Sequence, residues 1–93
     1  MIAVDTSALM AIVLDEPKAD ACVAALEAED EILISAGTLA ETLIVSARRN
    51  VGGEMSRFVD RLAPEIVTVT PAAARRIAEA YQGWDRVCTQ QQP

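Results

Sequence analysis

The chain has 93 residues, 52% of them apolar, and a net charge of −6 at pH 7. A chain of this length can form one domain at most, and its negative charge argues against a broad basic surface for nucleic acid. No stretch approaches the roughly 20 apolar residues of a membrane span, and Cys22 and Cys88 lack metal-ligand spacing. We therefore expect a cytoplasmic protein without a membrane segment.

The first predicted element is a strand over residues 2–4, an apolar run that is too short for a helix. It ends at Asp5, Thr6 and Ser7, whose side chains can accept hydrogen bonds from the free N–H groups of a helix start. Apolar residues at helical spacing then predict a helix over residues 7–15, and a following proline predicts a break before a second helix.

The run at residues 32–35 is apolar and lies between acidic residues and a glycine, which predicts a second buried strand. The segment 38–50 places Leu39, Leu43 and Ala47 on one face of a predicted helix, beside further apolar residues. We expect this helix to be buried on more than one side.

Two glycines then precede an amphipathic pattern that predicts a helix over residues 55–62. Residues 66–69 are apolar and β-branched and predict a third strand. Thr70 and Pro71 predict the start of a last helix, with threonine as the N-cap and proline at the first helical position.

This order of elements defines the fold class. Each pair of consecutive strands is separated by two helices, and such long crossovers are typical of parallel strands. The sequence therefore predicts an α/β domain, with a parallel sheet flanked by helices on both faces.

The end of the chain follows a different pattern. From Gly83 onward the sequence lacks an apolar period, so we expect a domain over residues 1–84 and an irregular tail over residues 85–93. Three strands leave the edge of the first strand uncovered, and an uncovered edge predicts self-association.

Asp5 interrupts an apolar run, and two interpretations of it are open. It can cap the following helix, although Thr6 and Ser7 could do so equally well. It can also belong to a functional site, because ligands of parallel α/β sheets bind beyond the carboxyl ends of the strands.

Glu41 is the second unusual carboxylate, since it lies among apolar residues on the predicted helix after the second strand. It could be a partly exposed side chain that extends past its apolar neighbours. It could also face Asp5 across the top of the sheet, where two carboxylates would repel each other unless a cation bound between them. Oxygen ligands of this kind favour Mg²⁺ or Mn²⁺.

Three segments carry a family pattern: IAVDTSALMAIVLDEP, ISAGTLAETLIVSAR and EIVTVTPAAARRIAEAY. Together they resemble the PIN domain of VapC-type toxin ribonucleases over nearly all of residues 1–84. The most specific part is a hydrophobic strand that ends in D-T-S, combined with a T-x-x-E helix after the second strand.

The resemblance implies a function and a set of site residues. Asp5 and Glu41 match acidic metal ligands of the family, and Ser7 matches a hydroxyl residue that supports the site. The implied activity is Mg²⁺- or Mn²⁺-dependent cleavage of an RNA phosphodiester, and the implied partner is a VapB-type antitoxin that holds the enzyme inactive.

The sequence departs from the family pattern at its end. A complete PIN domain continues beyond Trp84 and supplies a third acidic ligand, which Asp85 is not expected to replace. We therefore expect a PIN-like domain that is incomplete at its C-terminus, with impaired nuclease activity. The alternative is a non-catalytic binding module that retains the antitoxin or self-association surface.

Cationic side chains are few. Four arginines could contact RNA phosphates, although for each of them an ordinary solvated helix face is the favoured interpretation. They are Arg48, Arg49, Arg75 and Arg76.

Overall fold

The computed structural model describes the backbone of residues 1–88 and the side chains of residues 1–80. Its elements follow the order that the sequence predicts, two helices between consecutive strands and one helix after the last. They are β1 (Ile2–Ala3), α1 (Thr6–Val13), α2 (Ala19–Glu27), β2 (Ile32–Ser35), α3 (Ala36–Arg48), α4 (Gly52–Leu62), β3 (Glu65–Val67) and α5 (Pro71–Cys88).

The three strands form a parallel sheet in the order β1-β2-β3. Ala3 pairs with Leu33 on one side of β2, and Ile34 pairs with Ile66 on the other. Because the strands are parallel, their carboxyl ends lie at the same end of the sheet. The chain continues from there into α1 after β1 and into α3 after β2. The predicted fold class is confirmed.

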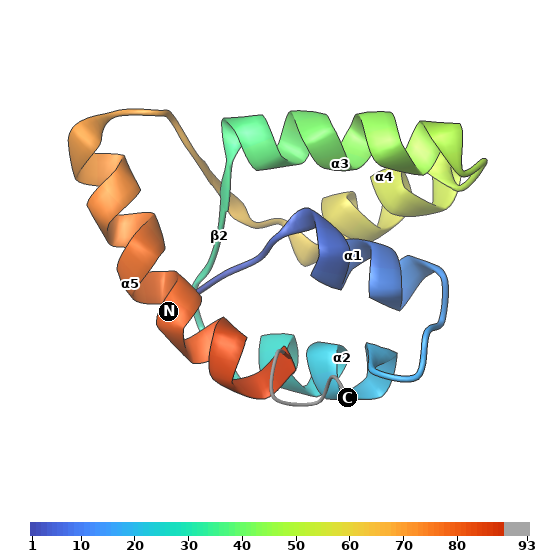
Figure 1. Ribbon diagram of the computed structural model, residues 1–93, viewed down its shortest axis with the longest axis horizontal. Coiled ribbons are helices and arrows are strands. Elements are labelled where there is room, and N and C mark those ends of the chain that lie inside the picture. The colour runs from blue at the N-terminus through green and yellow to red at the C-terminus, as the bar shows by residue number, and fades with distance from the viewer. Residues whose placement is uncertain (89–93) are drawn as a thin grey trace.

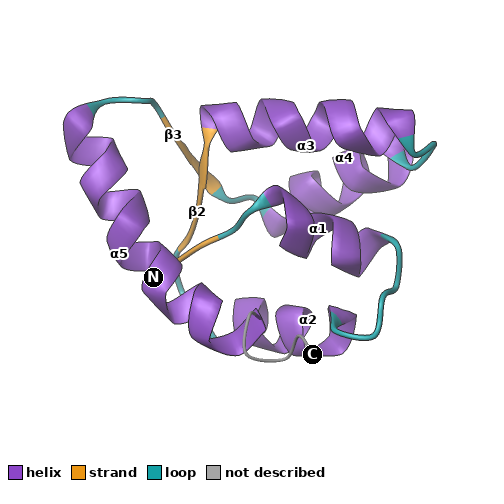
Figure 2. Cartoon of the chain, viewed as in Figure 1, coloured by secondary structure: helices purple, strands orange, loops and turns teal. Residues whose placement is uncertain are grey.

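Helices cover both sides of this sheet. Figure 1 shows the strands between α5 and a group formed by α1, α3 and α4, and Figure 2 shows how short the strands are beside these helices. Helix α1 packs on α2, α3 and α4, whereas α5 packs on β1 and β2. The helices therefore supply most of the buried surface.

The core is aliphatic. Its largest side chains expose 1% or less of their surface; they are Leu9, Leu33, Ile34 and Met55. Met55 is the buried residue of α4. Burial of one such side chain contributes about 1.5–3 kcal/mol. A short sheet is stable here because α5 packs on β1 and β2, and α3 packs on β2 and β3.

Helix α3 is buried on a different face from the predicted one. Leu43 is 40% exposed and Ile44 is 53% exposed, whereas Thr42 and Ser46 are completely buried. Each buried hydroxyl donates a hydrogen bond to a carbonyl of its own helix, so its burial leaves no unsatisfied polar group. These small side chains face the neighbouring helices, and the prediction that α3 is buried on more than one side was wrong.

The third strand is shorter than predicted and begins one residue earlier. It ends at Val67, which is buried, whereas Ile66 is 54% exposed and Val69 is 81% exposed. β3 lies at an edge of the sheet and pairs with β2 alone within the described residues. An apolar, β-branched composition therefore predicted the strand, but it did not show that one face stays open to solvent.

The first strand is also an edge of the described sheet, but its side chains are covered. Ile2, Ala3 and Val4 are only 3%, 1% and 1% exposed, because α5 packs against β1. The expected open surface at this strand is therefore absent from the described part of the chain.

Helix α5 extends further than the sequence indicated. It continues to Cys88, so residues 85–88 are helical where an irregular tail was expected. The expected tail at residues 89–93 lies outside the described residues. The boundary between residues 84 and 85 does not coincide with the end of a helix.

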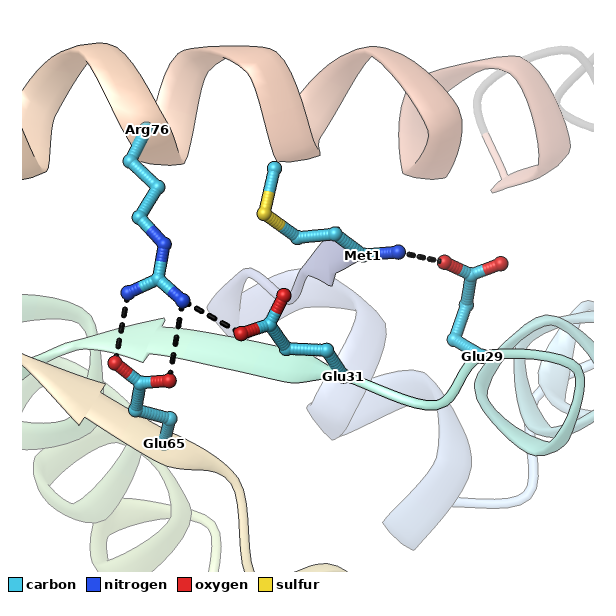
Figure 3. Close-up of polar contacts among 5 residues, drawn as sticks. All are labelled: Met1, Glu29, Glu31, Glu65 and Arg76. Carbon is cyan, nitrogen blue, oxygen red and sulfur yellow. Dashed lines mark hydrogen bonds and ion pairs between the residues drawn. The ribbon is translucent and has the colours of Figure 1, made fainter.

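An arginine joins α5 to the amino ends of two strands (Figure 3). The guanidinium of Arg76 donates to both carboxylate oxygens of Glu65, at 2.7 and 3.1 Å, and to Glu31 at 2.6 Å. The hydrogen bond from Arg76 lowers the pKa of Glu65. Nearby, the amino group of Met1 contacts Glu29 at 2.5 Å, and this bond raises the pKa of the amine.

Candidate functional site

A pocket of about 550 Å³ lies between the beginnings of α1 and α3 and extends along both helices. It brings together residues from five positions near α1 and three on or beside α3, together with two from the connection before α2. They are Asp5, Thr6, Ser7, Met10, Leu14, Glu16, Lys18, Glu41, Val45 and Arg49. Asp5, Ser7 and Glu41, the three predicted site residues, therefore line one pocket.

Asp5 is the N-cap of α1. One carboxylate oxygen, Oδ1, accepts a hydrogen bond from the backbone N–H of Ala8 at 2.8 Å and another from the hydroxyl of Ser7 at 3.1 Å. The capping interpretation is thus confirmed. Capping occupies only one of the two oxygens, because within the described residues Oδ2 accepts no hydrogen bond.

Glu41 is held by Thr6, which was predicted only as a possible helix cap. The hydroxyl of Thr6 donates to Oε1 of Glu41 at 2.5 Å and lies 3.1 Å from the hydroxyl of Thr42. Thr42 is buried and donates to the carbonyl of Thr38 at 2.8 Å. Thr6 therefore links the start of α1 to the carboxylate on α3.

The oxygens that remain decide what the pocket could bind. Oε2 of Glu41, like Oδ2 of Asp5, accepts no hydrogen bond in the described part of the chain. Neither carboxylate has an ion-pair partner there. Two carboxylate oxygens and a nearby serine hydroxyl are the donor types that hard divalent cations prefer.

The donor set is small. Among the residues whose side chains are described, no group of three or more His, Cys, Asp or Glu residues could hold a metal ion. The side chain of Asp85 lies outside that set. A cation held by the described residues would thus have two carboxylate ligands and would keep several waters, as Mg²⁺ usually does.

Three charged residues in the pocket are new relative to the predicted site. They are Glu16, Lys18 and Arg49, of which only Arg49 was considered from the sequence, as one of four arginines. No local sequence pattern marks Glu16 and Lys18, because their placement depends on how the chain turns after α1.

The other arginines lie elsewhere. Arg76 is paired with Glu31 and Glu65 at the amino ends of the strands, opposite the end that leads to Asp5. Arg48 and Arg75 are exposed and do not line the pocket. Of these four arginines, Arg49 is the one that lines the pocket.

Comparison with known proteins assigns the chain to a family. The family model of the PIN domain matches residues 2–88, so the chain belongs to the PIN domain family. It is similar to the protein named Ribonuclease VapC30 from Mycobacterium tuberculosis and to VapC ribonuclease Mb0640 from Mycobacterium bovis. Identity to each is 35% over 86 residues, which covers 89% of this chain and 66% of the relative.

The coverage of these relatives is partial. The chain spans just under two thirds of their length, so about one third of each has no counterpart in it. No helix in the described part of the chain is long and apolar enough to cross a membrane.

Proposed function

We propose that this chain is the metal-binding part of a VapC-type endoribonuclease, which cleaves phosphodiester bonds of RNA. The observation that carries the proposal is the meeting of Asp5 and Glu41 in one pocket, each with a carboxylate oxygen that accepts no hydrogen bond among the described residues. Membership of the PIN domain family and the ribonuclease names of the relatives support it.

Asp5 and Glu41 would hold Mg²⁺ or Mn²⁺, with Ser7 in support. A cation bound there supplies Lewis-acid chemistry, because it makes water more acidic and offsets the negative charge that develops on a phosphodiester. Ser7 and the N–H of Ala8 restrain Asp5, while Thr6 restrains Glu41. With only two carboxylates among the described residues, we expect weak metal binding and impaired activity.

The partners follow from the same assignment. We propose RNA as the substrate, a VapB-type antitoxin as the regulator and the cytoplasm as the location. Self-association stays a prediction without its original basis, since the side chains of β1 are covered. Sedimentation velocity over a range of protein concentrations would test it, and a monomer at every concentration would contradict it.

Cleavage of structured RNA with and without Mn²⁺ tests the proposed activity. Wild-type chain should cleave only with the metal, and both Asp5→Asn and Glu41→Gln should abolish cleavage. Asparagine is as good an N-cap as aspartate, so Asp5→Asn should remove a ligand charge while the helix start is kept.

Circular dichroism provides the folding control for both variants. Loss of cleavage with an unchanged spectrum supports the enzyme. If neither the wild-type chain nor the variants cleave RNA with metal, the non-catalytic binding module is the better interpretation.

A further inference from the structure

The candidate metal ligands occupy only one end of the pocket. Thr6 and Met10 on α1 and Leu14 at its C-cap follow one another at intervals of four residues, and all three line the pocket. Residues four apart lie on one face of a helix. The pocket is therefore a groove that runs along α1 away from Asp5.

Helix α3 forms the other side of this groove. Glu41, Val45 and Arg49 also recur at intervals of four and line the pocket. α1 and α3 pack against each other and run in the same general direction (Figure 1). Eight residues at about 1.5 Å each separate Glu41 from Arg49 by roughly 12 Å along the helix axis.

The same type of helix cap ends both sides of the groove. Asp15 follows α1 with φ 55°, and the N–H of Glu16 donates to the carbonyl of Ala11 at 2.9 Å. Asn50 follows α3 with φ 61°, and the N–H of Val51 donates to the carbonyl of Ser46 at 2.9 Å. Such left-handed caps stop the helix sharply. They fix the positions at which Lys18 and Arg49 reach the pocket.

Both cations are available for a ligand. Within the described residues, neither Lys18 nor Arg49 has a carboxylate within 4.0 Å. This distinguishes Arg49 from Arg76, whose guanidinium is occupied by two glutamates.

We propose that Lys18 and Arg49 form a phosphate subsite, which binds the RNA backbone beside the bond to be cleaved. The inference rests on the proposed function, because it needs the scissile phosphate to lie near Asp5 and Glu41. Arg49 lies about two helical turns beyond Glu41 along α3, so we expect the subsite to meet a flanking phosphate and not the scissile one.

The charge of the groove fits a polyanion only when a metal is bound. Three carboxylates, Asp5, Glu16 and Glu41, outnumber the two cations by one. A divalent cation at Asp5 and Glu41 would reverse the sign of this balance. RNA binding should therefore depend on metal even in the absence of cleavage.

The residues in the middle of the groove favour recognition of the RNA backbone over recognition of its bases. Met10, Leu14 and Val45 are apolar, and none of the residues that line the pocket in the described structure is aromatic. Bases are commonly held by stacking on aromatic rings, whereas phosphate contacts carry no sequence information. The subsite should thus tolerate any base and depend strongly on salt.

Binding of labelled single-stranded RNA in Ca²⁺ buffer, followed by fluorescence anisotropy over a salt series, tests the subsite. Arg49→Gln and Lys18→Gln should each weaken binding about three- to tenfold and lower the slope of log affinity against log salt by about 0.7. Glu16→Gln should strengthen binding, because it removes a charge that repels phosphate.

The neighbouring Arg48 provides a matched control. Arg48→Gln makes the same charge change at the same helix end outside the pocket, and it should alter affinity less than twofold. Equal effects of Arg49→Gln and Arg48→Gln would overturn the subsite. So would competition by an acidic peptide as effective as that by RNA.

Cleavage kinetics separate this inference from the proposed function. Arg49→Gln should raise KM about three- to tenfold with little change in kcat, whereas Asp5→Asn should abolish kcat. If Asp5→Asn abolishes cleavage and Arg49→Gln leaves KM unchanged, the subsite is wrong and the ribonuclease stands. If the wild-type chain neither binds nor cleaves RNA with metal, both are overturned.

Discussion

The carboxylate of Asp5 has one oxygen for a helix cap and a second oxygen for the proposed metal. Its Oδ1 atom caps α1 through Ala8, whereas its Oδ2 atom accepts no hydrogen bond among the described residues. Capping was confirmed, and the role as a metal ligand stays a prediction. The two roles do not compete, because a carboxylate has more acceptor positions than a cap requires.

Thr6 yields the prediction at the residue scale. Thr6→Val keeps the shape of the side chain but removes the hydroxyl that donates to Glu41. Groups that orient a metal ligand typically contribute 10- to 100-fold to affinity, so Mn²⁺ affinity should fall by at least about tenfold. Isothermal titration calorimetry measures this directly.

Two further variants give this test its controls. Thr6→Ser keeps a hydroxyl at the same position and should restore most of the affinity. Thr38→Val removes a hydroxyl that contacts Ser35 and not Glu41, so it should leave Mn²⁺ binding nearly unchanged. An affinity for Mn²⁺ that Thr6→Val does not alter would rule out the positioning role.

At the scale of elements, α5 is fixed to the sheet by Arg76. This side chain reaches Glu31 just before β2 and Glu65 at the start of β3. The sequence showed only an arginine on an amphipathic helix. Its partners are 45 and 11 residues away in the chain, so their meeting depends on the sheet register.

The lowered pKa of Glu65 predicts how this contact responds to pH. A carboxylate with a folded pKa below its ordinary value of 4.5 stabilises the fold above that pH, and this stability is lost as the pH falls through the lowered value. Arg76→Gln should remove that contribution. The free energy of unfolding of the variant should therefore decline less steeply below pH 4.5.

Urea unfolding at a series of pH values measures this difference. Arg57→Gln is a suitable control, since Arg57 contacts Glu54 only at 3.9 Å on an exposed helix face. A wild-type chain and an Arg76→Gln variant with the same acid dependence would contradict the assigned cause of the pKa shift.

At the scale of the whole molecule, metal binding should stabilise the fold. A ligand at ten times its dissociation constant adds about 1.4 kcal/mol to the free energy of unfolding. For a chain of this size the Tm should rise by roughly 5–10 °C. Differential scanning fluorimetry with increasing Mn²⁺ measures the shift.

The same carboxylates provide the control for thermal stabilisation. Asp5→Asn and Glu41→Gln should each remove most of the rise in Tm. Asp60→Asn removes a carboxylate outside the pocket, so it should leave the rise intact. A rise that persists in Asp5→Asn and Glu41→Gln would place the metal elsewhere.

Sequence patterns were enough to predict the order of elements, the parallel sheet and the positions of Asp5 and Glu41 after two strands. These features depend on local hydrophobic period, capping residues and crossover length, all of which are properties of consecutive residues. The sequence could not show that Thr42 and Ser46 face inward on α3, because their hydroxyls become buried only where other helices approach.

Which polar and charged residues come together depends on the tertiary structure. It brought Thr6 to Glu41 across 35 residues, paired Arg76 with two glutamates, and placed Lys18 and Arg49 in the pocket. Each of these contacts joins segments whose relative placement depends on helix packing and on the left-handed turns at helix ends. Local sequence patterns do not encode that placement.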